Sequence, residues 1–259
     1  MEPLALPLPT FLIIGAQKSA TRWLRLNLGL HPDVFAASAE LEFFNNGVRF
    51  RDEGTDWYRE QFSGWNGEAI VGEATPGYMF WRHGPAVVAE RIEDTVPDAR
   101  LIATLRNPID RAQSAMVHHI EMGGLPGDSV LVDLVKQTPP ERDKLGIIAG
   151  GWYAASLEPY RERFGDRLLV VLHDDVDDDP RGVYDTALVH IGAAPDFVPP
   201  EFERVRFSHQ VRPSTEPGRR PLTLDERREL WDYFAADVEK LEQMIGRDLS
   251  LWDPNREIR

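Results

Sequence analysis

The sequence predicts a three-layer α/β fold in which helices flank a central parallel sheet. Short apolar runs alternate along the chain with longer segments of helical periodicity, and the connections between them are short. Strands that are buried on both faces read as unbroken apolar runs, and this alternation is typical of a parallel sheet. No repeat or long linker divides the 259 residues. We therefore expect a single domain over residues 1–259, with its core at about 11–252.

Four segments are expected to be strands, because each is a short apolar run that ends at glycine, proline or a polar residue. They are residues 11–15 (FLIIG), 69–76 (AIVGEATP), 100–108 (RLIATLRNP) and 167–173 (RLLVVLH).

Seven segments are expected to be helices, because their apolar residues recur with helical spacing and prolines or glycines mark their ends. They are residues 21–30, 85–97, 108–121, 129–136, 151–164, 181–192 and one long amphipathic helix at 224–245. The acidic run DDVDDDP at 174–180 is expected to be a solvated turn whose last aspartates favour the following helix N-terminus.

Composition and charge narrow the classes of function. The formal net charge is −14 at pH 7, and a field of that sign repels nucleic acid, so we expect no nucleic-acid partner. Cysteine is absent, which excludes disulfides and thiolate metal sites. The N-terminal MEPLALPLPT does not resemble a signal peptide, and no run reaches membrane-spanning length. We therefore expect a cytoplasmic protein without stable membrane insertion.

The first expected strand runs into a loop, GAQKSATR at residues 15–22, that is suited to binding phosphate. Gly15 allows a tight turn, and backbone N–H groups at the start of the next helix can bind an anion. Lys18 adds a positive charge, while Ser19 and Thr21 add hydroxyl donors. The GxxxxGK[ST] pattern of ATP and GTP hydrolases is absent, because Lys18 follows Gly15 too closely. The alternative is an ordinary helix N-terminus with an unrelated lysine.

The third expected strand ends in arginine at RNPIDRAQS, where a magnesium-dependent hydrolase would normally carry an aspartate. Arg106 can make a forked contact with a terminal phosphate, and Ser114 on the following helix can add a hydroxyl. The alternative is a surface arginine that pairs with Asp110.

A third basic cluster lies at residues 204–221, RVRFSHQVRPSTEPGRRP. It holds five arginines against a single acid, Glu216, and its prolines and glycine indicate a loop. A lid over an anionic ligand and an ordinary solvated loop both fit this composition. Three basic sites without a metal-binding aspartate favour a multiply phosphorylated nucleotide that is held without a metal.

Taken together, these segments resemble the sulfotransferases that use 3′-phosphoadenosine 5′-phosphosulfate (PAPS). FLIIGAQKSATRWL resembles their 5′-phosphosulfate loop, and LRNPIDRAQS resembles their 3′-phosphate segment. HPDVFAASAELEFFNN resembles the Glu-x-x-Phe-Phe box of the heparan-sulfate-type and bacterial carbohydrate branch. DWYREQF, GEATPGYMF and GRDLSLW resemble further family segments, so the likeness runs from about residue 11 to 252. It implies a P-loop-like fold, PAPS as the donor and 3′,5′-adenosine bisphosphate (PAP) as the product, with no metal required.

The resemblance also implies roles for residues that bind the donor. Lys18 would contact the phosphosulfate and stabilise the leaving phosphate, and Arg106 would bind the 3′-phosphate. PGRRP resembles a loop that closes over the donor, but Pro217 stands where the family has a lysine, so one cationic contact is missing unless Arg220 supplies it. The implied donor-binding residues are Gln17, Lys18, Ser19, Ala20, Thr21, Arg22, Arg106, Ser114, Gly218 and Arg219.

Glu40 matches the catalytic base of the family, with Lys18 and His118 as further catalytic residues. The acceptor must lose a proton as it attacks, and a carboxylate that is partly desolvated by Phe43 and Phe44 can take it. Glu42 either shares this role or points to the opposite face of an extended segment. His118 lies one helical turn after Ser114 and could steady the base or the transferring group, with His119 and a plain surface histidine as the alternatives.

The acceptor is less well defined by the sequence. Ala74 stands where many relatives carry a lysine that contacts the donor. Either Glu73 and the backbone suffice without it, or the electrostatics at the transferring group are weaker. Trp152 and Tyr153 either line the acceptor cleft or pack in the core, and we expect packing. Because heparan-type acceptors are polyanions, the charge of −14 favours a smaller or less charged one: a sugar or glycolipid hydroxyl, an amine, or a bacterial natural product. A P-loop kinase that uses ATP and a donor-binding protein without catalysis are the alternative functions.

Overall fold

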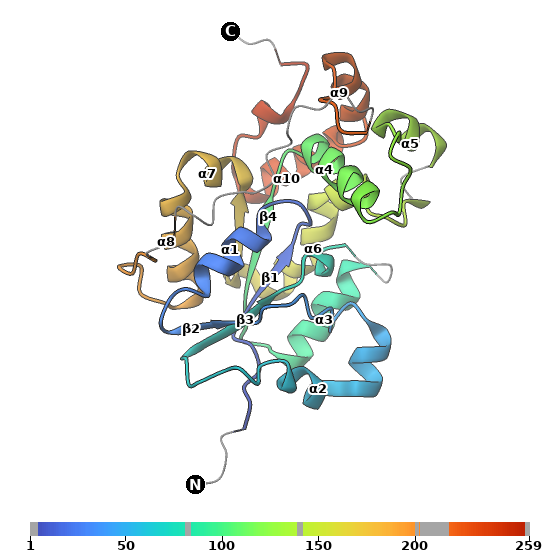
Figure 1. Ribbon diagram of the computed structural model, residues 1–259. Coiled ribbons are helices and arrows are strands. Elements are labelled where there is room, and N and C mark those ends of the chain that lie inside the picture. Colours follow the sequence, from blue (N-terminus) through green and yellow to red (C-terminus); the bar gives the residue numbers. More distant parts are fainter. Residues whose placement is uncertain (1–4, 81–83, 139–141, 200–201, 203–217, 257–259) are drawn as a thin grey trace.

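The computed structural model describes residues 5–80, 84–138, 142–199, 202 and 218–256, and it confirms the three-layer α/β architecture (Figure 1). Its sheet has five parallel strands in the order β2-β3-β1-β4-β5. The strands are β1 (Phe11–Gly15), β2 (Val34–Ala36), β3 (Ile70–Ala74), β4 (Arg100–Leu105) and β5 (Leu168–Leu172).

Both faces of the sheet are buried, as the apolar strands predict. Successive side chains of a strand point to opposite faces. Phe11 and Ile13 of β1 accordingly join one apolar cluster, whereas Leu12 and Ile14 join the other. All four are fully buried, so β1 forms the centre of the core and fixes the position of the loop that follows it.

Helices cover the two faces (Figure 1). α1 (Thr21–Leu28) and α8 (Pro180–Ile191) lie on one face, while α3 (Pro85–Thr95) and α6 (Tyr153–Phe164) lie on the other. Among the described residues, no helix is both long enough and apolar enough to cross a membrane. The remaining α-helices are α2 (Gly54–Glu60), α4 (Pro108–Glu121), α5 (Leu131–Gln137), α7 (His173–Asp178), α9 (Leu224–Trp231) and α10 (Ala235–Ile245).

The expected long helix at 224–245 is wrong, because the chain forms two helices with a break at 232–234. At the break, the N–H groups of Tyr233 and Phe234 donate to the carbonyls of Leu230 and Trp231, three residues back. Such tighter bonds change the direction of the axis.

The acidic run at 174–180 is also different from the expected turn, because most of it forms α7. The expected role of its last aspartate at a helix N-terminus is correct: Asp179 accepts a hydrogen bond of 2.9 Å from the N–H of Gly182 and caps α8. Sequence reasoning also missed the short strand β2 and the helix α2.

Gly72 provides a test of the core between β1 and β3. A Cβ atom at this position would overlap the ring of Phe11, which is fully buried. We expect Gly72→Ala to lower the free energy of unfolding by about 1–3 kcal/mol, as overpacked cores do. Urea denaturation checks this value, with Gly127→Ala as the matched control because a Cβ at Gly127 meets nothing within 4 Å. Equal stability of the two variants would contradict the packing described here.

Candidate active site

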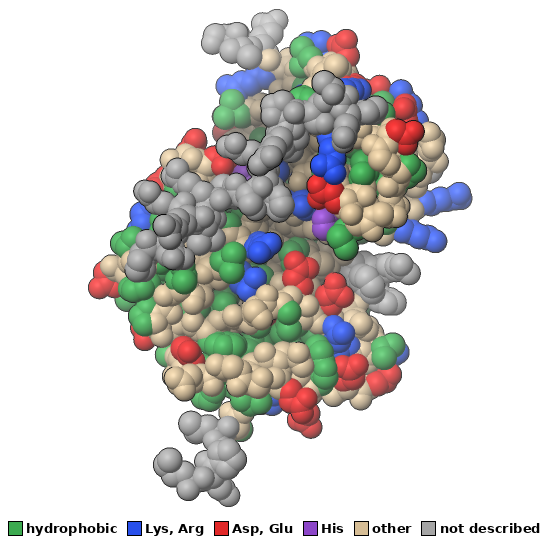
Figure 2. Space-filling model, in the orientation of Figure 1, with side chains coloured by type: hydrophobic (Ala, Val, Ile, Leu, Met, Phe, Trp, Pro, Cys, Tyr) green, Lys and Arg blue, Asp and Glu red, His purple; other side chains and the backbone are tan. Residues whose placement is uncertain are grey.

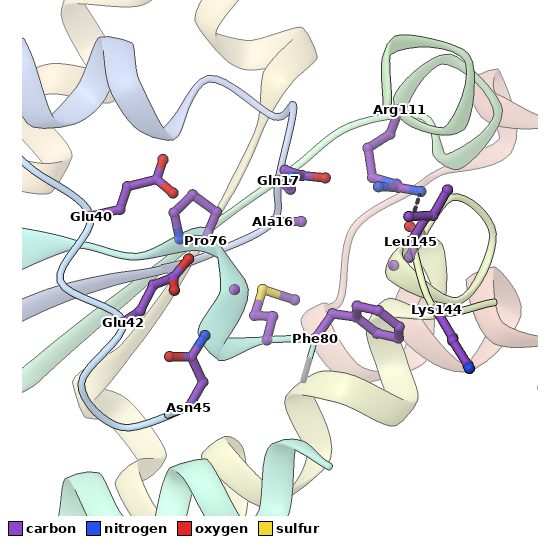
Figure 3. A pocket seen from close by; sticks show the side chains of 14 residues that line it. Ala16, Gln17, Glu40, Glu42, Asn45, Pro76, Phe80, Arg111, Lys144 and Leu145 are labelled. Atoms are coloured by element: carbon purple, nitrogen blue, oxygen red, sulfur yellow. Dashed lines mark hydrogen bonds between the residues drawn. The ribbon is translucent and has the colours of Figure 1, made fainter. Parts of the chain in front are cut away.

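A cavity of about 200 Å³ opens at the carboxyl ends of β1 and β3 (Figure 3). Glu40, Glu42 and Asn45 lie on one side, and Arg111, Lys144 and Leu145 lie on the other, with Gln17 and Phe80 between them. Ala16, Pro76, Gly77, Met79, Gly146 and Gly150 complete the lining. Ligands of open parallel sheets bind at this end of the strands. Of the residues expected to act on the donor or acceptor, Gln17 and Glu40 line the cavity.

The β1–α1 loop has the backbone of a constrained binding loop. Lys18 and Ala20 both have positive φ angles, of 69° and 71°, a conformation that is uncommon for residues other than glycine. Gly15 is required at the start of the loop, because a Cβ there would lie 2.7 Å from the sulfur of Met79. The loop therefore holds a fixed shape that its own residues do not favour.

The start of α1 offers unpaired hydrogen-bond donors. No side chain caps this N-terminus, and its first turn carries no acid, so the N–H groups of the first turn are available for an anion. Ser19 is fully buried; its hydroxyl lies close enough to the Tyr153 hydroxyl to lower the pKa of that group, but it makes no hydrogen bond of regular geometry within the described residues. Thr21 is also buried, whereas Arg22 is exposed. A buried hydroxyl without a well-formed hydrogen bond is costly, and an anionic ligand would supply one.

Charge interactions connect Lys18 to three other segments. Burial lowers the pKa of the Lys18 ammonium; Glu121 raises it, Arg106 lowers it and Glu40 raises it. Lys18 thus lies within electrostatic reach of the end of α4, the end of β4 and the segment that carries Glu40. The structure brings together the three residues expected at the phosphosulfate, the 3′-phosphate and the acceptor.

Glu40 lies where a general base is useful. Its side chain remains accessible to solvent, but partial burial raises the pKa of its carboxyl group, and the nearby Glu42 raises it further. Arg25 and Lys18 act in the opposite direction. A carboxylate with a raised pKa takes up a proton more readily than an ordinary one.

Glu42 does not lie on the opposite face from Glu40, as one alternative from the sequence proposed. Its φ angle is 49°, so the segment turns at this residue instead of continuing as an extended strand. Both carboxylates consequently line the same cavity (Figure 3).

Glu73 is fully buried beneath this segment and does not line the cavity. Its carboxyl group accepts hydrogen bonds from the hydroxyls of Tyr78 at 2.6 Å, Thr75 at 2.7 Å and Tyr58 at 3.1 Å. Burial raises its pKa to about 7, against the lowering effect of these bonds. Ala74, which stands at the position of the family lysine, is buried in the apolar cluster on the other face of β3.

The hydroxyls bound to Glu73 also hold the backbone of the Glu40 segment. Thr75 Oγ1 accepts hydrogen bonds from the N–H groups of Leu41 at 3.0 Å and Glu42 at 3.2 Å. The hydroxyl of Tyr78 accepts one from Phe43 N at 3.2 Å. Three consecutive N–H groups after Glu40 are thus fixed to side chains that Glu73 orients, and this network sets the position of Glu40.

Arg106, which directly follows β4, and Ser114 on α4 are at the same end of the sheet, and both are half-buried. The hydroxyl of Tyr153 donates to the carbonyl of Arg106 at 2.8 Å. Asp110 pairs with Arg227 at 2.6 Å. Tyr153 is fully buried in the core, as expected. Trp152 also packs, and its indole N–H donates to the carbonyl of Tyr233 at 2.8 Å.

Neither histidine of α4 lines the cavity. His118 is half-buried, and its ring contacts that of His119 with centroids 5.8 Å apart. His119 lies 3.1 Å from the carbonyl oxygen of Leu145, a residue of the cavity wall. The catalytic role of His118 stays a prediction.

Gly218 and Arg219 lie against α4. A Cβ at Gly218 would be 2.7 Å from Ile120 Cδ1, and Arg219 pairs with Glu121 at 3.5 Å. Arg220 does not replace the missing lysine contact in this structure, because it forms a bidentate ion pair with Glu226. Arg204, Arg206, Arg212 and Pro217 of the expected lid lie outside the described residues.

Sequence reasoning missed several residues of the cavity. Arg111 was noted as part of the RNPIDRAQS motif, but the structure buries it and directs its Nη2 to the carbonyls of Gly146 and Ile147. Asn45 directly follows Phe43 and Phe44, and this proximity to the Glu-x-x-Phe-Phe box was the available signal. No sequence feature pointed to residues 144–146.

The comparisons with known proteins agree with this geometry. The sequence model described as "Sulfotransferase domain" matches residues 8–194. This chain belongs to the sulfotransferase family. A solved sulfotransferase from Alicyclobacillus acidocaldarius superimposes with a TM-score of 0.78 and 31% identity, over 95% of this chain and 99% of that one. The resemblance stated from the sequence is confirmed, and with it the assignment as an enzyme.

Curated relatives include mouse heparan sulfate glucosamine 3-O-sulfotransferase 6, which is 33% identical over 62% of this chain and 43% of its own length. The human bifunctional heparan sulfate N-deacetylase/N-sulfotransferase 3 is 28% identical over 73% of this chain and 23% of its own length. The chain therefore matches less than half of the length of these relatives. A mouse sulfotransferase complexed with PAP shares the fold, with a TM-score of 0.53 and 15% identity over 94% of this chain and 86% of that one.

The buried carboxyl of Glu73 predicts a pH-dependent stability. Its pKa is raised from 4.5 to about 7 in the folded protein, so the folded state binds this proton more tightly than the unfolded state does. The contribution of Glu73 to stability is therefore greatest at low pH and is lost as the pH rises from 4.5 to about 7. The total loss is on the order of 3–4 kcal/mol, because the pKa rises by about 2.5, from 4.5 to about 7.

We expect Glu73→Gln to remove this dependence, because glutamine stays neutral throughout the range. Chemical denaturation of both proteins at several pH values measures the difference between them, so that other titrating groups cancel. A difference that stays constant with pH would contradict the buried, easily protonated state of Glu73.

Proposed function

We propose that this enzyme transfers a sulfuryl group from PAPS to a hydroxyl, or an amine, of a sugar, glycolipid or small natural-product acceptor, with Glu40 as the general base. The observation that carries this proposal is the placement of Glu40 on the wall of a cavity that begins at the β1–α1 loop, within electrostatic reach of Lys18. A base and a cation on either side of a transferring group are what in-line displacement needs.

The residues of the β1–α1 loop fit a phosphosulfate. The buried Ser19 hydroxyl makes no hydrogen bond of regular geometry within the described residues, the first turn of α1 has no side-chain cap, and Lys18 adds a positive charge. These groups would hold the 5′-phosphate end of the donor. Arg106 and Ser114 would hold its 3′-phosphate, and Gly218 and Arg219 would lie at its outer side. The mouse sulfotransferase that shares the fold is complexed with PAP, which supports this choice of donor.

PAPS would supply an activated sulfuryl group on a phosphate leaving group. Glu40 takes the acceptor proton as the new oxygen–sulfur bond forms, and Lys18 neutralises the charge that collects on the phosphate oxygen as the old bond breaks. The Glu73 network keeps Glu40 in place during the transfer. In this proposal Gln17, which lies between the loop and Glu40 (Figure 3), contacts the transferring group.

The surface supports an acceptor of low negative charge. On the face shown in Figure 2, acidic side chains are interspersed with basic ones, so the described part of this face carries no continuous basic band. The formal charge of −14 also disfavours binding of a polyanionic acceptor. The curated relatives are named for heparan sulfate, but we propose that this chain acts on a less charged carbohydrate or natural product.

A non-catalytic donor-binding protein and an ATP-dependent kinase remain as alternatives from the sequence. The raised pKa of Glu40 and its place on the cavity wall favour catalysis over binding alone. The β1–α1 loop lacks the hydrolase consensus, which favours PAPS over ATP. The cytoplasmic location and the role of His118 stay predictions.

Binding of PAP tests the donor. Without added metal, we expect PAP to bind at least about tenfold more tightly than ATP, because Arg106 and Ser114 meet a 3′-phosphate that ATP lacks. Arg106→Ala should weaken PAP binding strongly and adenosine 5′-phosphate binding little. Calorimetry measures all of these affinities. Equal losses for both nucleotides would remove Arg106 from the 3′-phosphate site, and a preference for ATP with magnesium would favour the kinase.

Substitution of Glu40 tests the base. We expect Glu40→Gln to bind PAP like the wild type but to lose about 100-fold or more in turnover, because the amide cannot take a proton. Lys18→Ala, in contrast, should lose both PAP affinity and turnover. Release of PAP in the presence of an acceptor measures turnover. A Glu40→Gln enzyme with full activity would exclude Glu40 as the base.

A further inference from the structure

We infer that Tyr153 is a positioning residue that fixes the two phosphate sites of the donor relative to each other, so that a ligand with both phosphates gains affinity. Its hydroxyl reaches the β1–α1 loop at Ser19 and the β4–α4 turn, which consists of Arg106 and Asn107. This inference rests on the proposed function, because it takes the loop and the turn as the 5′-phosphate and 3′-phosphate sites.

The Tyr153 hydroxyl contacts both segments. It donates a hydrogen bond of 2.8 Å to the carbonyl oxygen of Arg106. Burial raises the pKa of Tyr153 to about 12, against the lowering effects of the Arg111 charge, the bond to Arg106 and the Ser19 hydroxyl. The effect of Ser19 on this pKa shows that the two hydroxyls are neighbours. Because Tyr153 keeps its proton at neutral pH, its bond to Arg106 persists there.

The sheet joins the two segments as far as the ends of their strands. β1 and β4 pair up to Gly15 and Ala103, and the N–H of Ala16 donates to the carbonyl of Thr104 at 2.8 Å. Past these contacts the chain leaves the sheet, as a loop on one side and a turn on the other. Tyr153 contacts the loop and the turn beyond this point, so it extends the connection that the strands begin.

Tyr153 is itself held in place. It is fully buried, and its ring packs edge-on against Trp252 with centroids 6.3 Å apart. Asp237 accepts hydrogen bonds of 2.9 and 3.1 Å from the N–H groups of the next two residues of α6. The carbonyl of Trp252 also accepts a bond of 3.2 Å from the Asn107 side chain. A hydroxyl on so firm a support can fix the segments that it contacts.

A fixed spacing matters for a ligand with two phosphates. PAP must place both phosphates at once, whereas a monophosphate needs one site in its proper position. Without the Tyr153 hydroxyl, the loop and the turn could move independently. PAP would then have to order both segments as it binds, which lowers its affinity, while a monophosphate would order one.

Tyr153→Phe tests the inference, because it removes the hydroxyl and keeps the ring. Calorimetry compares PAP, adenosine 5′-phosphate and adenosine 3′-phosphate on the wild type and the variant. We expect the variant to lose about tenfold or more in affinity for PAP, but about twofold or less for each monophosphate. Equal losses for the three ligands, or no loss for PAP, would overturn the inference.

Tyr160→Phe is the matched control. Tyr160 lies on the same helix and is fully buried, and its hydroxyl also donates to a backbone carbonyl, that of Tyr78 at 2.6 Å. In urea denaturation the two variants should lose similar stability, whereas Tyr160→Phe should bind all three nucleotides like the wild type. If Tyr160→Phe also lost PAP affinity selectively, loosening of the core would explain both results and the inference would fall.

Amide hydrogen exchange tests the coupling in the unmodified protein. Coupling between two sites is reciprocal, so each monophosphate should protect the segment that binds the other phosphate. Adenosine 5′-phosphate should slow exchange in residues 106–111, and adenosine 3′-phosphate should slow it in residues 15–22. Absence of this protection in the wild type would contradict the inference, even if Tyr153→Phe failed to fold.

The outcomes separate the two proposals. A wild type that prefers PAP to ATP, together with equal losses for all three nucleotides in Tyr153→Phe, would overturn the inference and leave the proposed donor in place. A wild type that does not bind PAP would overturn the proposed function itself.

Discussion

The geometry of the site depends on one buried carboxyl group. The Glu73 side chain is buried on one face of the sheet, where a charged group is poorly solvated. Hydrogen bonds from three hydroxyls replace those that it would make with water. Two of these hydroxyls, on Thr75 and Tyr78, use their remaining capacity to accept the backbone N–H groups of residues 41–43. Glu73, a buried residue of β3, therefore determines the position of the cavity side that carries Glu40 and Glu42.

The order of the strands explains why the functional segments meet. β1 lies between β3 and β4 in a parallel sheet, so the segments that leave these three strands emerge side by side. The segment after β1 is the loop that carries Lys18, the segment after β3 carries Thr75 and Tyr78, and the segment after β4 begins with Arg106. The two apolar clusters hold β1 from both faces, which gives the loop after Gly15 a rigid base.

The sequence predicted much of this arrangement, because the responsible signals are local. An apolar run followed by glycine, lysine and hydroxyl residues identifies the loop after β1, and the arginine after β4 can be read in the same way. The three residues of β2 are too few to show a period. The shared cavity of Glu40 and Glu42 depends on the positive φ of Glu42.

Local signals could not reveal the role of Glu73. Its partner Tyr58 lies on α2, well before β3 in the chain, and meets Glu73 and Tyr78 only in the folded core. The burial of Arg111 depends in the same way on carbonyls about 35 residues further on. Long-range contacts of this kind are set by tertiary packing, which periodicity and residue type do not report.

The separation of the Glu42 segment from the loop after β1 has an evolutionary consequence. Glu42 is exposed on a segment whose backbone is anchored from below, so its side chain can be exchanged while the anchor and the loop after β1 stay intact. Ser19 and Thr21, in contrast, are buried and tolerate little change. On the proposed function, a lineage built on this scaffold can diversify the molecules that it modifies through a few surface substitutions, while the activated donor remains the same.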